Sequence, residues 1–447
     1  MCLPTLAIKY IGRVLLTFLV AFSGLILSTS SIFAATFDIP SNDVTGLINA
    51  INISNSNGQT NIINLANNSE YLLTTKFSSP YSDNGLPLIT SNITINGNGS
   101  KIYRDISAPR FRIVAIESPG SLTLNNITLS KGESVDVING HENPYDNSDY
   151  YGGGAILNQN GTLVINYSFI SENLAYEGGG GGIWVENNSV TTINNTTLSN
   201  NQVLGAASGG MLVVRGTANI KVENSIIANN FAENNGGVLY SNSTGNITLN
   251  NNLISNNSAK NHGGAIHNHK GNIVLDKNDV NKNNVTIISS SFGLGGAIYN
   301  QIDGAITITN SYFTNNTATN TTHNGGFLYN RGIASVNNSC IAGNSSTSLA
   351  NFGSHINAQQ NWWGGSAGPN QPGADTVNGS VDFTNWLTSC PPLASPTPSP
   401  QPTKTPVVVL PGLGGSWNTA AMISGGTGGS WKKTPFVKVY DNLKATF

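Results

Sequence analysis

Carboxylate and phenol side chains gather in one segment of the sequence, residues 132–151. Chemistry on a polysaccharide needs two or three carboxylates on one face, either flanking a glycosidic bond or holding calcium against a uronate. This segment could bind a sugar or a cation through Glu133, Asp136, Glu142, Tyr145, Asp146, Asp149, Tyr150 and Tyr151. Because five acids spread over a loop define no fixed geometry, a solvated loop is the favoured interpretation.

Two other motifs match catalytic patterns only in part. Arg104, Arg110 and Arg112 could supply the base of a lyase, but no Asp cluster accompanies them and an Arg-x-Pro-x-x-Arg spacing is absent. Ser366 lies in Gly-Gly-Ser-Ala-Gly, which has the letters of a serine-hydrolase elbow, yet no apolar strand leads into it. We expect structural pairing for the arginines and a turn around Ser366, and we assign no catalytic residue.

Three histidines form the remaining candidate, because His267 and His269 could share a strand face with His262 nearby and bind a metal ion. No carboxylate or Cys ligand stands close to them in the sequence. We therefore predict no metal site and no cofactor.

Composition narrows the class of protein. Charged residues are 9% of the 447 residues against 38% hydrophobic ones, and the chain holds 66 Asn and 50 Gly. Helix content should be low, because Asn and Gly are poor helix formers. The formal net charge of −2 gives no basic surface for nucleic acid or for an anionic membrane.

The first 34 residues predict export. A basic start precedes a mostly apolar run over residues 14–32, which is typical of a cleaved signal peptide, with an uncleaved anchor as the alternative. Either way the body is expected to be secreted or at the cell surface. Loss of Cys2 leaves Cys340 and Cys390 as an even pair in an oxidising compartment, so a disulfide and two free thiols are both open.

Internal repeats are the strongest signal in the sequence. A Gly pair followed by apolar residues recurs with its second Gly at positions 154, 182, 210, 237, 264, 296 and 326. Each repeat continues with an alternating run, as at residues 162–165, and a third run that begins with Asn, as at residues 310–313. Three short strands per repeat predict an all-β solenoid with one coil per repeat.

Asn recurs where each third run ends, for example at Asn201, Asn230 and Asn257. Asn tolerates left-handed backbone angles, and its amide can bond to the amide in the coils above and below. We therefore predict a column of stacked Asn side chains along one corner of the solenoid, which satisfies its own buried polar groups.

The ends of the solenoid need caps. A short helix with Ser41 as its N-cap should place residues 44–51 over the first coil. Residues 361–369 should fold over the last coil. Seven Pro between residues 391 and 406 then indicate an extended linker, which we place at residues 391–405.

Several of these features together carry a resemblance to a known family. The Gly-Gly-apolar repeats, Phe-Arg-Ile at residues 111–113, and Asn-Trp-Trp-Gly at residues 361–364 resemble bacterial secreted right-handed parallel β-helix proteins of the pectate-lyase-like superfamily. The resemblance covers residues 35–390 and implies a three-sheet solenoid. It does not specify function, because this scaffold hosts lyases, hydrolases, adhesins and surface proteins without activity.

A second resemblance is short. Residues 407–417 are similar to the first strand and following loop of α/β-hydrolase lipases and esterases, which implies an oxyanion loop at Gly412, Leu413 and Gly414. The chain ends before a nucleophile elbow of that fold could appear. Residues 406–447 therefore look like the incomplete start of a hydrolase domain.

The sequence thus favours a β-helix that is not an enzyme and that binds or is displayed toward extracellular ligands such as polysaccharides or cell-surface glycans. One alternative is a polysaccharide lyase or glycoside hydrolase on the same scaffold. The other is the N-terminal part of an extracellular lipase or esterase. No nucleic-acid partner is expected, and membrane contact is expected only through an uncleaved signal segment.

Overall fold

The structure is a computed structural model that describes residues 34–78, 83–135, 152–286, 293–318, 324–345 and 347–392. The predicted signal peptide up to residue 33, most of the Pro-rich linker and the hydrolase-like fragment with Gly412, Leu413 and Gly414 lie outside the described residues. Within these ranges no helix has both the length and the apolar character that a membrane span requires.

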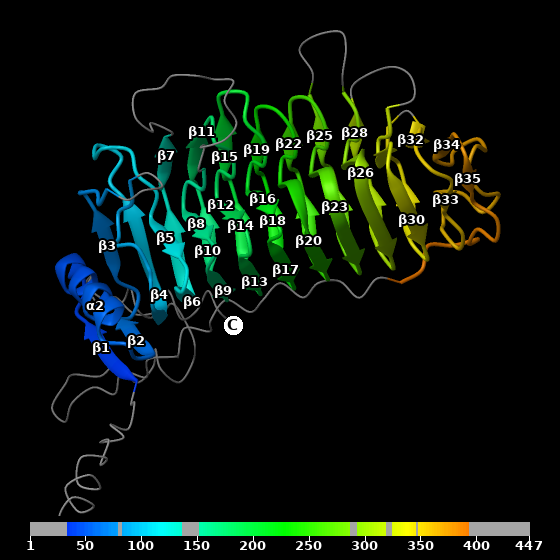
Figure 1. The fold of residues 1–447 in the computed structure, drawn as a ribbon. Helices are drawn as coiled ribbons and strands as arrows, with labels where there is room; N and C mark the ends of the chain where they lie inside the picture. Colours follow the sequence, from blue (N-terminus) through cyan, green and yellow to red (C-terminus); the bar gives the residue numbers. More distant parts are fainter. Residues whose placement is uncertain are drawn as a thin grey trace, which may run out of the picture. The chain divides into compact units, whose positions relative to one another are not determined.

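Each repeat forms one coil of a parallel β-solenoid (Figure 1). A representative coil runs through β8 (Ile156–Gln159), β9 (Thr162–Asn166), β10 (Phe169–Ser171) and β11 (Leu174–Tyr176). The next coil then pairs with it in parallel, for example Ile183 with Ile156 and Val190 with Thr162. The three runs predicted per repeat are present, and a short fourth strand follows the Asn corner.

Four strand columns therefore run across the coils, and three long strands, β20, β23 and β26, continue from the first column into the second. The first-strand column contains β5 (Val114–Glu117), β8, β12 (Ile183–Glu186), β16 (Leu212–Gly216), β20 (Leu239–Asn250), β23 (Ile266–Asp276), β26 (Ile298–Thr309), β29 (Leu328–Asn330), β32 (Thr347–Asn351) and β34 (Thr376–Asn378). The second-strand column adds β1 (Ala35–Ile39), β2 (Asn61–Leu65), β4 (Asn92–Arg104), β6 (Ser121–Ser130), β9, β13 (Val190–Asn194), β17 (Asn219–Glu223), β30 (Ile333–Asn337), β33 (Ile356–Asn357) and β35 (Val381–Asp382).

The other two columns consist of shorter strands. The third-strand column contains β3 (Glu70–Leu73), the ends of β4 and β6, then β10, β14 (Thr197–Ser199), β18 (Ile226–Ala228), β21 (Leu253–Ser255), β24 (Asp279–Asn281), β27 (Tyr312–Thr314) and β31 (Cys340–Ala342). The fourth is a separate seven-stranded sheet of β7 (Glu133–Val135), β11, β15 (Gln202–Leu204), β19 (Phe231–Ala232), β22 (Ser258–Ala259), β25 (Asn284–Val285) and β28 (Thr317–Ala318).

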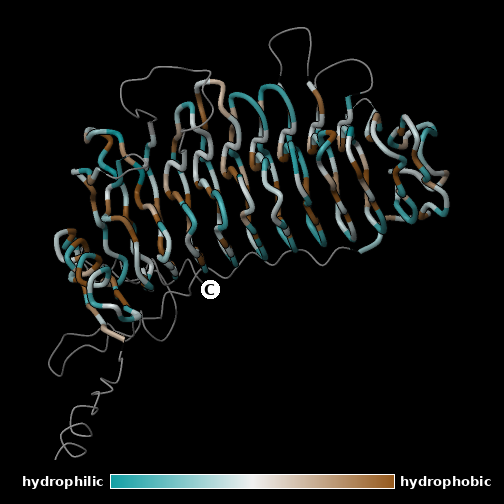
Figure 2. Tube along the Cα trace, in the orientation of Figure 1, coloured by the Kyte–Doolittle hydropathy of each residue, from teal (hydrophilic) through white to brown (hydrophobic). Residues whose placement is uncertain are grey.

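Alternation along the strands builds the core. In β9 the side chains of Leu163 and Ile165 point into the core and are buried, whereas that of Thr162 points outward and is exposed. Hydrophobic and hydrophilic residues accordingly alternate along the coils in Figure 2. The fourth strands bury small side chains, including Ala175, Ala232 and Ala259, as a separate cluster.

The predicted Asn column is confirmed and links seven Asn side chains. Asn201 Nδ2 donates to Asn230 Oδ1 at 3.1 Å, and Asn230 Nδ2 donates to Asn257 Oδ1 at 2.9 Å. The same pattern joins Asn173, Asn201, Asn230, Asn257, Asn283, Asn316 and Asn344. At the end of the column Asn344 Nδ2 donates to the Asp375 carboxylate at 2.7 Å. Asp375 therefore ends the column, because a carboxylate accepts hydrogen bonds and has no amide N–H to donate further.

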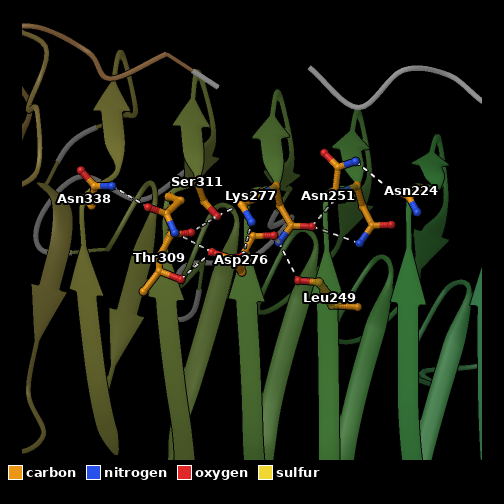
Figure 3. Close-up of polar contacts among 11 residues, drawn as sticks. Asn224, Leu249, Asn251, Asp276, Lys277, Thr309, Ser311 and Asn338 are labelled. Atoms are coloured by element: carbon orange, nitrogen blue, oxygen red, sulfur yellow. Dashed lines mark hydrogen bonds and ion pairs between the residues drawn. The ribbon is translucent and has the colours of Figure 1, made fainter. Parts of the chain in front are cut away.

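A second polar column follows the corner between the second and third strands (Figure 3). Asp276 accepts hydrogen bonds there from Thr309 Oγ1 at 2.8 Å and Asn310 Nδ2 at 2.7 Å. Asn251 Nδ2 donates to Asn224 Oδ1 at 2.7 Å. These side chains tie neighbouring coils together at the surface.

The end caps differ in detail from the predictions. Helix α2 (Val44–Ser56) buries Leu47 and Ile51 over the first coil, but its N-cap is Asp43, whose carboxylate accepts from the Gly46 N–H at 2.8 Å. Ser41 instead bonds to the Ser69 hydroxyl. The Ser41 prediction was wrong because an Asx-type cap two residues later satisfies the first helical turn.

The Asn-Trp-Trp segment is a rung of the solenoid and does not cover its end. Trp362 pairs with Cys340 in the third-strand column, and Trp363 is fully buried. A further layer lies beyond it, since β34 and β35 pair with β32 and β33, and the Leu387 N–H donates to the Asn361 carbonyl. The prediction that this segment folds over the last coil is therefore wrong.

Candidate functional site

The structure places one residue of the predicted acidic loop. Glu133 begins β7 and its carboxylate pairs with Arg104 and, at 3.0 Å, with Arg110. Arg110 also lies over the Tyr176 ring at 4.9 Å, and Arg112 is fully buried. Structural pairing of Arg104 and Arg110 is confirmed, and Glu133 serves as their counter-ion. The other predicted loop residues, Asp136, Glu142, Tyr145, Asp146, Asp149, Tyr150 and Tyr151, lie outside the described residues.

The remaining sequence candidates are placed near the C-terminal end. Cys340 and Cys390 are joined by a disulfide with a Cα–Cα distance of 5.2 Å. Ser366 lies in a turn, where its carbonyl accepts from the Trp386 indole N–H at 3.3 Å. Neither the disulfide nor the turn at Ser366 places a nucleophile beside a base in the interactions described.

A feature that sequence reasoning missed is a line of rings along the first-strand column. At one register position, residues of successive first strands are direct strand partners. In chain order these residues are Trp184, Val213, Tyr240, His267, Tyr299 and Tyr329. These residues alternate with core residues such as Ile266, so they lie on the outer face of the sheet. In the next coil this position is Ala350, and the Phe352 ring two residues further along contacts Tyr329. We call the rings of this set, together with Phe352, the aromatic row.

Rings of the aromatic row contact one another from coil to coil. The ring centroids of Tyr299 and Tyr329 are 5.4 Å apart with an interplanar angle of 7°, and those of Tyr329 and Phe352 are 5.1 Å apart. His267 lies 5.2 Å from Tyr240 and 4.8 Å from Tyr299, measured between centroids. Stacked rings cover each other's faces and leave their edges for contact with a ligand.

Exposure varies along the row and is highest at its C-terminal end. Trp184 is 2% exposed, Tyr299 is 5% exposed and Phe352 is 56% exposed, while Tyr240 and Tyr329 are half-buried. Trp184 is covered because the Gly-rich turns before the first strands cross its ring; a Cβ at Gly152 would lie 2.9 Å from it. The accessible rings are therefore Tyr240, Tyr329 and Phe352, while His267 and Tyr299 between them are buried.

Polar groups border the row two residues further along each strand. The Trp184 indole N–H donates to Glu186 at 3.0 Å, and the Arg215 guanidinium lies 5.5 Å from the Trp184 ring. Nearer the exposed end, the Arg331 guanidinium bonds to Tyr299 and His269 Nδ1 contacts the Gln301 side-chain oxygen at 2.6 Å. The row thus combines rings with hydrogen-bond donors at a regular interval.

Comparison with known families bears on the scaffold. Residues 112–280 match the family model described as "Right handed beta helix region". This chain folds as a right-handed parallel β-helix. The match runs from β5 into β24 and includes Trp184, Tyr240 and His267 of the aromatic row. Comparisons with curated proteins and with solved structures gave no match. The likenesses to the pectate-lyase-like superfamily and to lipases remain predictions.

Two histidines of the β-helix are neutral because they are buried. Burial lowers the pKa of His262 to about 4, and burial together with the charge of His262 lowers the pKa of His267 to about 3. His262 stacks on Tyr299 at 4.7 Å between centroids. Within the described coils no group of three or more His, Cys, Asp or Glu side chains is placed to hold a metal ion.

These depressed pKa values predict an acid-sensitive fold. Between pH 6.5 and about 4 the unfolded chain binds protons that the folded chain excludes, so the stability present above pH 6.5 is lost as pH falls. Each histidine contributes a slope of up to roughly 1.4 kcal/mol per pH unit. Replacing His267 with Phe should flatten the dependence of urea stability on pH by about that amount. His355→Gln, at an exposed histidine, is the control, and equal slopes for all three proteins would contradict the assignment.

Proposed function

We propose that this protein is a secreted or cell-surface β-helix that binds an extended glycan along its aromatic row and does not act as an enzyme. The observation that carries the proposal is the row itself: four consecutive coils place an aromatic ring or imidazole at one register position, and the Phe352 ring continues the line in the next coil. No single repeat would suggest this surface, because its residues become neighbours only when the coils stack.

Spacing supports an extended ligand. Parallel strands are about 4.8 Å apart, so the row offers one set of contacts per coil at that interval. A linear polysaccharide has a repeat of similar length, and successive sugars could meet equivalent positions. Tyr329 and Phe352 offer apolar contact, and Arg331 and Gln301 offer donors to hydroxyl or carboxyl groups.

Two features support an extracellular location. The first 34 residues have the pattern of a signal peptide. The Cys340–Cys390 disulfide fits an oxidising compartment, since cytoplasmic thiols are kept reduced.

Glycan binding is tested by applying the full-length chain to a glycan array and measuring the dissociation constant of each retained glycan. Tyr329→Ala and Phe352→Ala should each weaken binding at least tenfold, about 1.4 kcal/mol, because exposed aromatic anchors dominate such contacts. Tyr167→Asn is the matched control: Tyr167 is 49% exposed, lies away from the row, and has a φ of 52°, close to the 48° of the equivalent Asn195.

Retention of no glycan, or equal binding by the two row variants and the control, would sink the proposal. The same incubations, assayed for unsaturated products and new reducing ends, test the absence of catalysis. Product that accumulates with wild-type chain would replace the binding protein by the lyase or hydrolase alternative.

A further inference from the structure

Two imidazole nitrogens of β23 converge on one oxygen. His269 Nδ1 lies 2.6 Å from Gln301 Oε1, and His267 Nε2 lies 3.4 Å from the same atom. His269 lies at an irregularity of β23 between Asn268 and Lys270, and its ring reaches the same amide oxygen as that of His267 on the outer face of the sheet. Their ring centroids are 6.3 Å apart with an interplanar angle of 26°. Such an arrangement is a two-imidazole clamp closed by an amide oxygen from the next coil.

The amide oxygen fixes the protons of both rings. A carbonyl oxygen can only accept, so each ring must present an N–H to Gln301 and carry its lone pair on the other nitrogen. His267 Nδ1 is then a lone pair that is buried and has no hydrogen-bond partner among the described residues. The side chain of His267 is 4% exposed, whereas His269 and Gln301 are half-buried. The clamp is therefore anchored in the protein and open to solvent on one side.

We propose that His267 Nε2, His269 Nδ1 and Gln301 Oε1 form a binding site for one divalent transition-metal ion. The ion takes the place between the nitrogens that the amide oxygen now fills, and Gln301 moves outward to become the third ligand, with water completing the coordination. The ring protons shift to His267 Nδ1 and His269 Nε2, so the rings stay neutral and no proton needs to leave the site.

The ligand set decides which ions fit. Two imidazoles and an amide oxygen suit Cu²⁺, Ni²⁺ and Zn²⁺, whereas Mg²⁺ and Ca²⁺ prefer oxygen-only sites. The His267 ring is held between Tyr240 and Tyr299, at 5.2 and 4.8 Å between centroids, so its position is fixed. This inference is independent of glycan binding, since it requires the three side chains alone.

The test is calorimetric titration of the full-length, metal-free chain with copper, nickel, zinc and magnesium chlorides. One ion should bind per chain, copper most tightly, and magnesium should give no heat. His269→Asn should weaken copper binding at least tenfold, and Gln301→Ala by tenfold or less, while His355→Asn should leave it unchanged. His269 and Gln301 are half-buried, so these variants are expected to fold; circular dichroism checks this.

The electron paramagnetic resonance spectrum of the copper-loaded chain gives a second readout. Couplings to two imidazole nitrogens are expected for wild type, and to one for His269→Asn. Binding that is unaffected by His269→Asn, or a stoichiometry set by other histidines and lost with His355→Asn, would overturn the site. So would the absence of binding by the wild-type chain.

Discussion

Replacing Asn257 with Ala is expected to lower the free energy of unfolding by about 3 to 5 kcal/mol. Asn257 is fully buried in the Asn column. Its Oδ1 accepts from the backbone N–H and the side-chain amide of Asn230, both at 2.9 Å, and its Nδ2 donates to the Ile227 carbonyl at 2.9 Å. Truncation leaves these buried groups unpaired, and each such group costs about 1 to 3 kcal/mol.

The matched control for Asn257 is Asn246→Ala. Asn246 lies in β20 of the same coil and its side chain is exposed, so its loss should change stability by less than about 0.5 kcal/mol. Urea unfolding followed by circular dichroism measures both variants. If Asn257→Ala lost no more stability than the control, the hydrogen bonds of the Asn column would not contribute to the stability of the fold.

The second large effect is expected from Cys390→Ser. The disulfide joins residues 50 positions apart, and a closed loop of that length corresponds to about 4 kcal/mol of chain entropy in the unfolded state. Coils contact only their neighbours, so the loss should be confined to the C-terminal layers. The bond also holds the return segment, whose Leu387 N–H reaches the Asn361 carbonyl.

Hydrogen–deuterium exchange shows where that effect lies. In Cys390→Ser the amides of β31 to β35 should exchange faster, and those of β12 to β18 should be unchanged. Uniform acceleration throughout the solenoid would contradict the nearest-neighbour picture, and unchanged exchange in β31 to β35 would show that the bond adds nothing to the end of the fold.

Much of the scaffold could be predicted because its causes are local and repeated. Gly pairs mark the turns before the first strands, and Asn marks the corner where amides stack, so both recur at visible intervals. The fourth strand was harder to predict: it is two or three residues long and buries small side chains such as Ala232 and Ala259, which give no alternating pattern. The N-cap at Asp43 was missed because Ser41 offers the same chemistry two residues earlier.

The aromatic row could not be recognised from any one repeat. Its members differ in type, with Val213 between Trp184 and Tyr240, and only strand register makes them neighbours. One signal was available: in most repeats the row residue is the third after the second Gly, as for Tyr240, His267 and Tyr299. The signal is visible only when the repeats are aligned in columns, whereas the clustered carboxylates of residues 132–151 stand out in a single segment.

The most direct test of glycan binding along the row is hydrogen–deuterium exchange of the full-length chain with and without the glycan that the array retains. Protection should appear in the first strands of the exposed coils, at residues 240–242, 267–270, 299–303 and 328–331. Residues 162–166 of β9 in the second-strand column should exchange equally in both samples. Protection confined to another strand column would contradict the account, because the ligand would then bind a surface that the aromatic row does not form.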